Sequence, residues 1–138
     1  MTLNPDPPSS DPLVLTFPKG LLGFPTLQTF HLFEPQDGYP LKFLQSVDTE
    51  EISFTCMNPA GIKEDYEVPL SDEEAEALAL SSQEDALILT LVVIPEDPRR
   101  MTTNLAGPLV INTKTRVGFQ IALNSDQYPL RFPILPQD

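Results

Sequence analysis

The 138-residue chain has few of the side chains that most often carry out chemistry, with one cysteine, one histidine and no tryptophan. A single cysteine, Cys56, excludes an intrachain disulfide and fits a reducing compartment. It lies on the apolar side of a strand-like segment, where a thiol is inert. His31 stands between Phe30 and Leu32 in another such segment and has no partner for a catalytic triad. We therefore expect no catalytic residue and no enzymatic activity.

Metal and cofactor motifs are equally scarce. The sequence has no CxxC, no HExxH and no cluster of cysteine and histidine. The acidic runs at 48–51 and 72–74 lack the ligand spacing of a calcium-binding loop. Gly20 and Gly23 are not followed by the lysine and hydroxyl residue of a phosphate-binding loop. We expect no metal and no cofactor.

Basic residues are also few, eight against 20 acidic residues, which gives a formal net charge of −12. This balance disfavours direct binding to nucleic acid or to an anionic membrane surface. It leaves two interpretations open, plain solubility or attraction to a basic protein partner. Residues 48–97 hold 14 of the acids and only Lys63, whereas residues 99–131 hold five basic residues and one acid. Folding could separate these segments into a dipole or bring them together.

No long apolar run is present, since the longest, 86–94, is too short to span a bilayer. No basic-then-apolar start typical of a signal peptide is visible. The cytoplasm is the expected location.

What the chain does have is 16 prolines and many short apolar stretches. This pattern favours strands joined by stiff turns over a helical bundle. We predict an all-β, mainly antiparallel domain, a barrel or a sandwich, with one or two short helices. Residues 1–12 are expected to be a flexible, proline-rich lead-in, and residues 13–138 a single domain. The predicted strands are 13–17, 27–33, 41–47, 52–57, 86–94, 109–112, 116–123 and 128–132.

Local signals refine this prediction. Ser71 and Glu74 form a capping-box pattern, which predicts a helix beginning there and ending near Leu80. Strand 86–94 is apolar enough to be buried on both faces. Residues 112–115 are predicted to turn a hairpin, 36–38 another turn, and Gly118 to mark a β-bulge.

Several segments together resemble the flagellar assembly factor FliW family, in the family's order and over about residues 13–135. They are 16–24 (TFPKGLLGF), 43–47 (FLQSV), 58–59 (NP), 65–67 (DYE), 93–98 (VIPEDP), 101–105 (MTTNL), 104–112 (NLAGPLVIN), 115–116 (TR), Gln120 and 126–129 (DQYP).

This resemblance implies a compact β-barrel-like fold and a cytosolic regulator, monomeric when free. Proteins of the family bind flagellin and also the basic translational repressor CsrA, the carbon storage regulator. Binding antagonises the repressor and relieves its action on flagellin mRNA, and the two partners exclude one another. The resemblance attributes this inhibition to an allosteric effect, which the sequence does not distinguish from direct competition.

The residues that would bind partners are taken from the matching motifs. They are Asn58, Pro59, Asp65, Tyr66, Glu67, Met101 and Asn104. Each also has a purely structural interpretation: residues 58–59 as a turn, Tyr66 as part of the barrel wall, and residues 101–105 as a packed corner. Residues 60–64 (AGIKE) depart from the aromatic and apolar residues common there in the family.

Two other functions stay open. A barrel of this size could hold one small ligand as a carrier or sensor, which would require a large apolar cavity. A hydrolase would need a deep cleft with carboxylates of separated pKa.

Overall fold

The computed structural model describes residues 13–35, 40–124 and 126–135. The expected lead-in 1–12 and the turn 36–38 lie outside this part of the chain. The strands are β1 (Leu13–Thr16), β2 (Thr29–Phe33), β3 (Leu41–Ser46), β4 (Ser53–Met57), β5 (Ala86–Val93), β6 (Thr102–Thr103), β7 (Leu109–Asn112), β8 (Val117–Gln120) and β9 (Phe132–Pro133). The helices are α1 (Asp72–Leu78) and the 3₁₀ turns η1 (Pro59–Gly61), η2 (Gln83–Asp85) and η3 (Pro98–Arg100).

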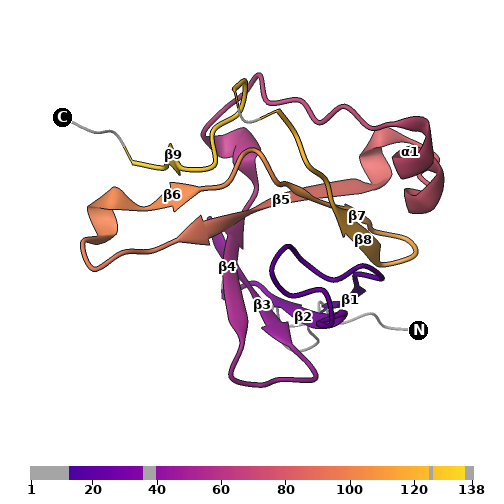
Figure 1. The fold of residues 1–138 in the computed structure, drawn as a ribbon, viewed down its shortest axis with the longest axis horizontal. Helices are drawn as coiled ribbons and strands as arrows, with labels where there is room; N and C mark the ends of the chain where they lie inside the picture. The colour runs from indigo at the N-terminus through magenta and orange to yellow at the C-terminus, as the bar shows by residue number, and fades with distance from the viewer. Residues whose placement is uncertain (1–12, 36–39, 125, 136–138) are drawn as a thin grey trace, which may run out of the picture.

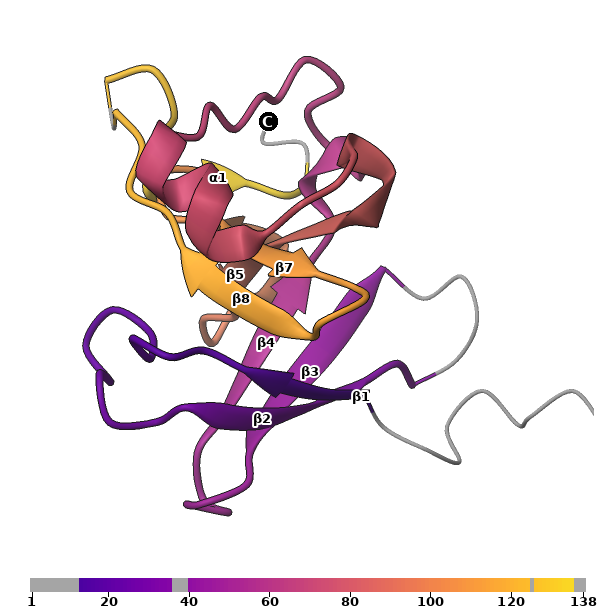
Figure 2. The ribbon, with the colours of Figure 1, turned by 90° about the vertical axis from the view of Figure 1, so that its right-hand side faces the viewer.

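Seven of the described strands close a barrel (Figures 1 and 2). Their order is β4-β3-β2-β1-β8-β7-β5, and β5 returns to pair with β4. All neighbours run antiparallel except β1 and β8, which pair in parallel where Thr16 faces Val117. The prediction of a mainly antiparallel, barrel-like all-β fold is confirmed. Closure leaves these seven strands without the open edges that promote aggregation.

Strand β5 is the longest and pairs with three other strands. Its first half pairs with β7, and its second half pairs with β4 and β6. Beyond the barrel, β6 and β9 continue the sheet as a projecting extension, on the left in Figure 1. The prediction that β5 is buried on both faces is wrong at this end, where the side chain of Val93 is 62% exposed. Residues past the barrel wall have no second layer to cover them.

The barrel interior is filled by apolar side chains. Its fully buried members come from nearly every strand and from the loop after β1: Leu15, Phe17, Leu21, Leu27, Phe30, Leu32, Leu44, Cys56, Leu89, Leu109 and Ile111. Phe30 anchors this set through an edge-to-face contact with Phe17, their ring centres 5.7 Å apart. These residues alternate with more exposed ones along β1 and β2, as the two-residue period of a strand requires, whereas β7 is buried on both faces.

Helix α1 begins as predicted. The Ser71 hydroxyl accepts a hydrogen bond from the Glu74 amide, and the Glu74 carboxylate accepts one from the Ser71 amide. The helix lies outside the barrel and contacts β8 (Figure 2). There Leu78 packs with Val110 and Ile121 in a second apolar cluster. No helix in the described ranges is both long and apolar enough to cross a bilayer.

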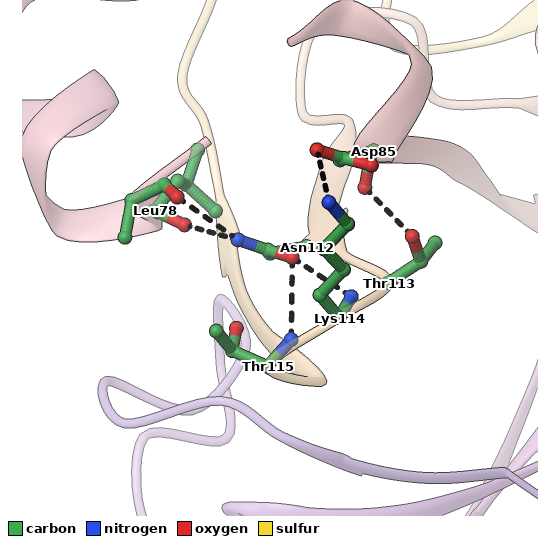
Figure 3. A network of polar contacts seen from close by, with 7 residues as sticks. Leu78, Asp85, Asn112, Thr113, Lys114 and Thr115 are labelled. Carbon is green, nitrogen blue, oxygen red and sulfur yellow. Dashed lines mark hydrogen bonds and ion pairs between the residues drawn. The ribbon is translucent and has the colours of Figure 1, made fainter. Parts of the chain in front are cut away.

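Asn112 joins the end of α1 to the hairpin between β7 and β8 (Figure 3). Its side-chain nitrogen donates to the carbonyl oxygens of Leu78 and Ala79, at 2.9 and 3.2 Å. Its side-chain oxygen accepts from the amides of Lys114 and Thr115, at 2.8 and 3.2 Å. One buried amide therefore terminates a helix and shapes the predicted turn at 112–115.

Two strand predictions need correction. Gly118 is not a bulge, because β7 and β8 pair residue for residue from Leu109 with Gln120 to Asn112 with Val117. Glycine fits there because a Cβ atom would lie 2.8 Å from side-chain atoms of Ile111 and Phe17. The last strand is Phe132–Pro133 rather than 128–132, and sequence analysis missed its short partner β6.

Folding spreads the acidic residues over several sides of the molecule. In Figure 1, α1 is at the upper right, the turn between β3 and β4 is at the bottom, and the connection from β5 to β6 is at the left. Arg99 on that connection pairs with Asp97 at 3.1 Å. The charge is therefore not a simple end-to-end dipole.

Candidate binding surface

An open groove of about 920 Å³ lies outside the barrel, beside α1. Its lining comes from the segment before α1, from α1, from the residues after α1, from β5 and β7, and from residues 127–128. We call its aliphatic residues, Val68, Leu70, Leu80, Ile88 and Val110, the groove floor, and residues 81–83 the groove wall. The lining residues are Tyr66, Glu67, Val68, Pro69, Leu70, Ala75, Leu80, Ser81, Ser82, Gln83, Ala86, Ile88, Val110, Gln127 and Tyr128.

Two tyrosines of the groove lining contact each other. The rings of Tyr66 and Tyr128 meet edge to face, with their centres 4.8 Å apart. The Tyr66 hydroxyl donates to the carbonyl oxygen of Leu105, and the Tyr128 hydroxyl accepts from the amide of Glu67 at 3.2 Å. Burial, with a smaller effect of Tyr128, raises the pKa of Tyr66 above its ordinary value. Tyr66 therefore stays neutral and pins its segment to the barrel.

The groove floor is apolar and only partly covered. Val68, Leu70, Leu80 and Ile88 pack against the cluster around Leu78 yet remain partly accessible. The Asn112 network holds the groove wall in place, because it ties the end of α1 to the barrel (Figure 3). Lys114 adds an ion pair to Asp85 at 3.5 Å, and Thr113 donates to the Asp85 carbonyl at 3.0 Å.

The segments that line the groove are rich in acidic residues. No lysine or arginine occupies a sequence position within two residues of any lining residue. The acids within that distance are Glu64, Asp65, Glu67, Asp72, Glu73, Glu74, Glu76, Glu84, Asp85 and Asp126. Of these, Asp65 and Asp85 form ion pairs with lysines. The chain segments that line the groove therefore carry a net negative charge.

Of the predicted binding residues, only Tyr66 and Glu67 line the groove. Asp65 lies beside them, exposed, with its carboxylate 2.9 Å from the Lys63 ammonium. The hydrogen bond from Lys63, together with its charge, holds the pKa of Asp65 below its ordinary value. The segment 65–67 is thus a charged and aromatic corner of the groove.

Asn58 and Pro59 begin the 3₁₀ turn η1. The Asn58 side chain is the cap of this turn and accepts from the Ala60 amide at 3.0 Å, while Pro59 is buried. These contacts match the structural interpretation of this pair as a turn. Asn58 is still exposed and remains a candidate for partner contact.

Met101 and Asn104 flank β6. Asn104 turns the chain through its side-chain oxygen, which accepts from the Ala106 amide at 2.9 Å. The carbonyl oxygen of Met101 accepts from the Ile134 amide at 3.0 Å. Both side chains are half-buried, in a corner that joins the extension to the barrel.

Buried hydroxyls bring the two predicted segments together. The Thr103 hydroxyl lies 2.7 Å from that of Thr90 and donates to the Leu91 carbonyl at 2.8 Å. The Thr90 hydroxyl in turn lies 3.5 Å from the carbonyl of Met57. Strand β5 thus holds the end of β4, just before Asn58, beside β6. The predicted residues share one side of the protein without forming one cleft.

Sequence reasoning missed most of the groove. Leu70, Leu80 and Ile88 are apolar residues, and no local pattern in the sequence distinguishes them from core residues. Gln127 and Tyr128 were available from the motif at 126–129, which the resemblance had already marked. Tyr128 in this motif was therefore the one sequence signal that pointed to a further residue of the groove.

The described residues offer little chemistry. They contain no group of three or more histidine, cysteine, aspartate or glutamate side chains arranged to hold a metal ion. Cys56 is fully buried, and burial raises the pKa of its thiol to about 12. His31 is a half-buried strand residue whose ring meets Phe33 edge to face.

The chain was compared with known proteins. A family model described as FliW protein matches residues 8–134. The chain is 39% identical to the flagellar assembly factor FliW of Natranaerobius thermophilus, over 88% of this chain and 81% of that protein. It is 38% identical to the factor of Caldicellulosiruptor saccharolyticus, over 89% and 80%, and 34% identical to that of Clostridium botulinum strain Langeland, over 91% and 87%.

The fold agrees with the sequence comparison. A crystal structure of the flagellar assembly factor FliW superposes with a TM-score of 0.83 at 28% identity, covering 91% of this chain and 87% of that one. The family match and the relatives each extend over most of the chain. The chain belongs to the FliW family of flagellar assembly factors.

Proposed function

We propose that this flagellar assembly factor acts in the cytoplasm as a regulator that binds proteins. Its partners are flagellin and a CsrA-type translational repressor. Binding the repressor relieves repression of flagellin mRNA, and flagellin competes for the factor. The factor itself contacts no nucleic acid or membrane, is monomeric when free, and catalyses no reaction.

One observation carries this proposal: an accessible apolar groove with an acidic surround, on a member of an assembly-factor family. Protein interfaces depend on a few apolar or aromatic anchors surrounded by polar groups. The two tyrosines and the floor at Leu70, Leu80 and Ile88 supply such anchors. An RNA-binding repressor carries a basic surface, which an acidic partner attracts.

A carrier that holds a ligand inside the barrel finds less support. The interior contains the packed aromatic and aliphatic cluster around Phe30, whereas the groove opens outside. Hydrolysis would need reactive groups, and the thiol of Cys56 is buried in that same packed interior.

A displacement titration tests the proposal. The full chain is mixed with purified repressor from the same source, the complex is isolated, and flagellin is added in steps. We expect the repressor to be retained at physiological salt and then released as flagellin binds. Retention of neither partner would contradict the proposed function.

Charge reversal tests the electrostatic part. The double variant Asp65→Lys with Glu67→Lys should slow repressor association at low salt, and the difference should shrink as salt screens the charges. The matched control reverses Asp48 and Glu50, two exposed acids on the turn between β3 and β4. An equal slowing in both double variants would indicate an effect of net charge alone.

A further inference from the structure

The groove floor is the first clue to its occupant. Val68, Leu70, Leu80, Ile88 and Val110 place aliphatic side chains along it. Four of these five side chains are only partly buried, unlike the residues of the barrel interior. Apolar surface of this kind is stabilised when other apolar groups cover it. The occupant must therefore present apolar side chains.

Charge around the groove is the second clue. Glu67 belongs to the lining, and Asp72, Glu73, Glu76, Glu84 and Asp126 flank it within two sequence positions. None of these six acids has an ion-pair partner in the described part of the chain. The nearby lysines, Lys63 and Lys114, are already paired with Asp65 and Asp85. A cationic occupant would be attracted by these acids, which no ion pair neutralises, whereas an anionic one would be repelled.

Polar groups in the lining are the third clue. Ser82 caps η2 without using its hydroxyl. The side-chain amides of Gln83 and Gln127 also have no intramolecular hydrogen bond within the described ranges. These groups belong to the same lining as the apolar floor. They can bind polar groups of an occupant whose apolar face points down.

We propose that this groove docks a cationic amphipathic segment of a partner protein. Its apolar side chains cover the floor at Leu70, Leu80 and Ile88, and its lysines or arginines lie along the acidic rim. This inference rests on the proposed function, since it assigns a site and a chemistry to one of the bound partners. A peptide is a better occupant than a small ligand, because the apolar lining residues and the acidic residues belong to several segments along the groove.

The sharpest test uses two alanines of α1. Ala75 lines the groove, while Ala77 is exposed on the same helix and does not line it. Because each residue turns the helix by about 100°, their side chains lie about 160° apart around the helix axis. Ala75→Arg therefore puts bulk and positive charge into the groove. Ala77→Arg makes the same change in net charge and helix propensity elsewhere.

The probe is a synthetic fluorescein-labelled peptide with leucines on one helical face and lysines at its flanks. Binding to the full chain is measured by fluorescence anisotropy. We expect Ala75→Arg to weaken binding by about tenfold or more and Ala77→Arg by less than about threefold. Equal effects of the two variants would overturn the proposal, because they would show attraction by net charge alone.

Two further peptides separate the apolar and the charged requirements. One replaces the leucines with serines, and the other replaces the lysines with glutamates. We expect both to bind at least about tenfold more weakly than the original peptide. If either peptide bound as tightly as the original, the proposal that the occupant needs both apolar and cationic side chains would be contradicted.

The same variants are then tested with purified repressor and flagellin. If the wild-type chain retains either protein but Ala75→Arg weakens neither, the groove proposal fails and the proposed function stands. If the wild-type chain retains neither, the proposed function fails, and the peptide result decides the chemistry of the groove by itself. Folding of each variant is verified by its urea unfolding midpoint.

Discussion

The barrel interior and the outer face beneath α1 are both apolar, but their side chains are buried to different extents. Inside, the residues around Phe30 are almost completely buried. Outside, Leu78, Val110 and Ile121 are buried, while Val68, Leu70, Leu80 and Ile88 stay partly accessible. A closed ring of strands covers the first set on all sides. A seven-residue helix covers only part of the second.

This difference separates stability from recognition. Complete burial stabilises the fold and leaves nothing for a partner to contact. Incomplete burial costs some stability, yet it leaves an apolar surface that a partner can cover. The fold can therefore remain stable with a partly exposed apolar outer face, because most of its buried apolar surface lies in the barrel interior.

The largest expected effect comes from truncating an interior anchor. Phe30→Ala removes a fully buried ring that packs on Phe17 and Phe54, with ring centres 5.7 and 6.1 Å away. We expect the free energy of unfolding to fall by about 4 kcal/mol, measured by urea denaturation. Leu80→Ala in the groove floor should cost only about 1 kcal/mol, because its side chain is already partly exposed. Equal losses would erase the distinction between the two regions.

The connection between the regions comes next. Asn112→Ala leaves two carbonyl groups at the end of α1 and two amides of the hairpin without their buried partner. We expect a loss of about 2 kcal/mol in the free energy of unfolding. The neighbouring control, Thr113→Ala, removes one exposed hydrogen bond to Asp85 and should cost about 0.5 kcal/mol.

Local exchange distinguishes this role from general destabilisation. Since Asn112 ties α1 to the barrel, its loss should increase amide hydrogen exchange in α1 more than in β2. A uniform increase across both elements would mean that Asn112 does not hold the groove wall specifically.

The sequence predicted the barrel well because its signals are local. Alternating apolar residues, proline and turn residues marked most strands, and the Ser71 capping box marked α1. The two-residue β6 was missed because no period can be read from a segment that short. Its existence depends on β5 on one side and on β9, about 30 residues later, on the other.

The candidate site was predicted less well for a related reason. Tyr66 and Glu67 were found from a motif, but the groove forms only when they meet Tyr128, more than 60 residues later. Partial burial of Leu80 or Ile88 depends on how much of the sheet α1 covers. That coverage is set by tertiary packing and leaves no mark in the local pattern.

Gly118 offers a smaller test from the interior side. Gly118→Ala adds one methyl group that would lie 2.8 Å from Ile111 and Phe17 atoms and 3.1 Å from the Val110 carbonyl oxygen. Overpacking of this kind costs about 1–3 kcal/mol, more than the roughly 0.5–1 kcal/mol that replacing glycine can contribute. We therefore expect a net loss of about 1 kcal/mol in urea denaturation. A stabilised variant would show that the interior has unused space beside β8.

The smallest energetic change gives the most direct chemical comparison of the two regions. Ser82→Cys places a second thiol on the exposed groove wall and should change the free energy of unfolding by less than about 0.5 kcal/mol. At pH 8 we expect a disulfide reagent to label the introduced thiol rapidly and Cys56 only on unfolding, because burial raises the Cys56 pKa to about 12 and blocks access. The same raised pKa means that the native state retains a proton which the unfolded chain loses above about pH 9, so Cys56 reduces stability as the pH rises from 9 towards 12. Rapid labelling of both thiols in the native protein would show that the barrel interior opens as readily as the groove, and the contrast between the two regions would then be lost.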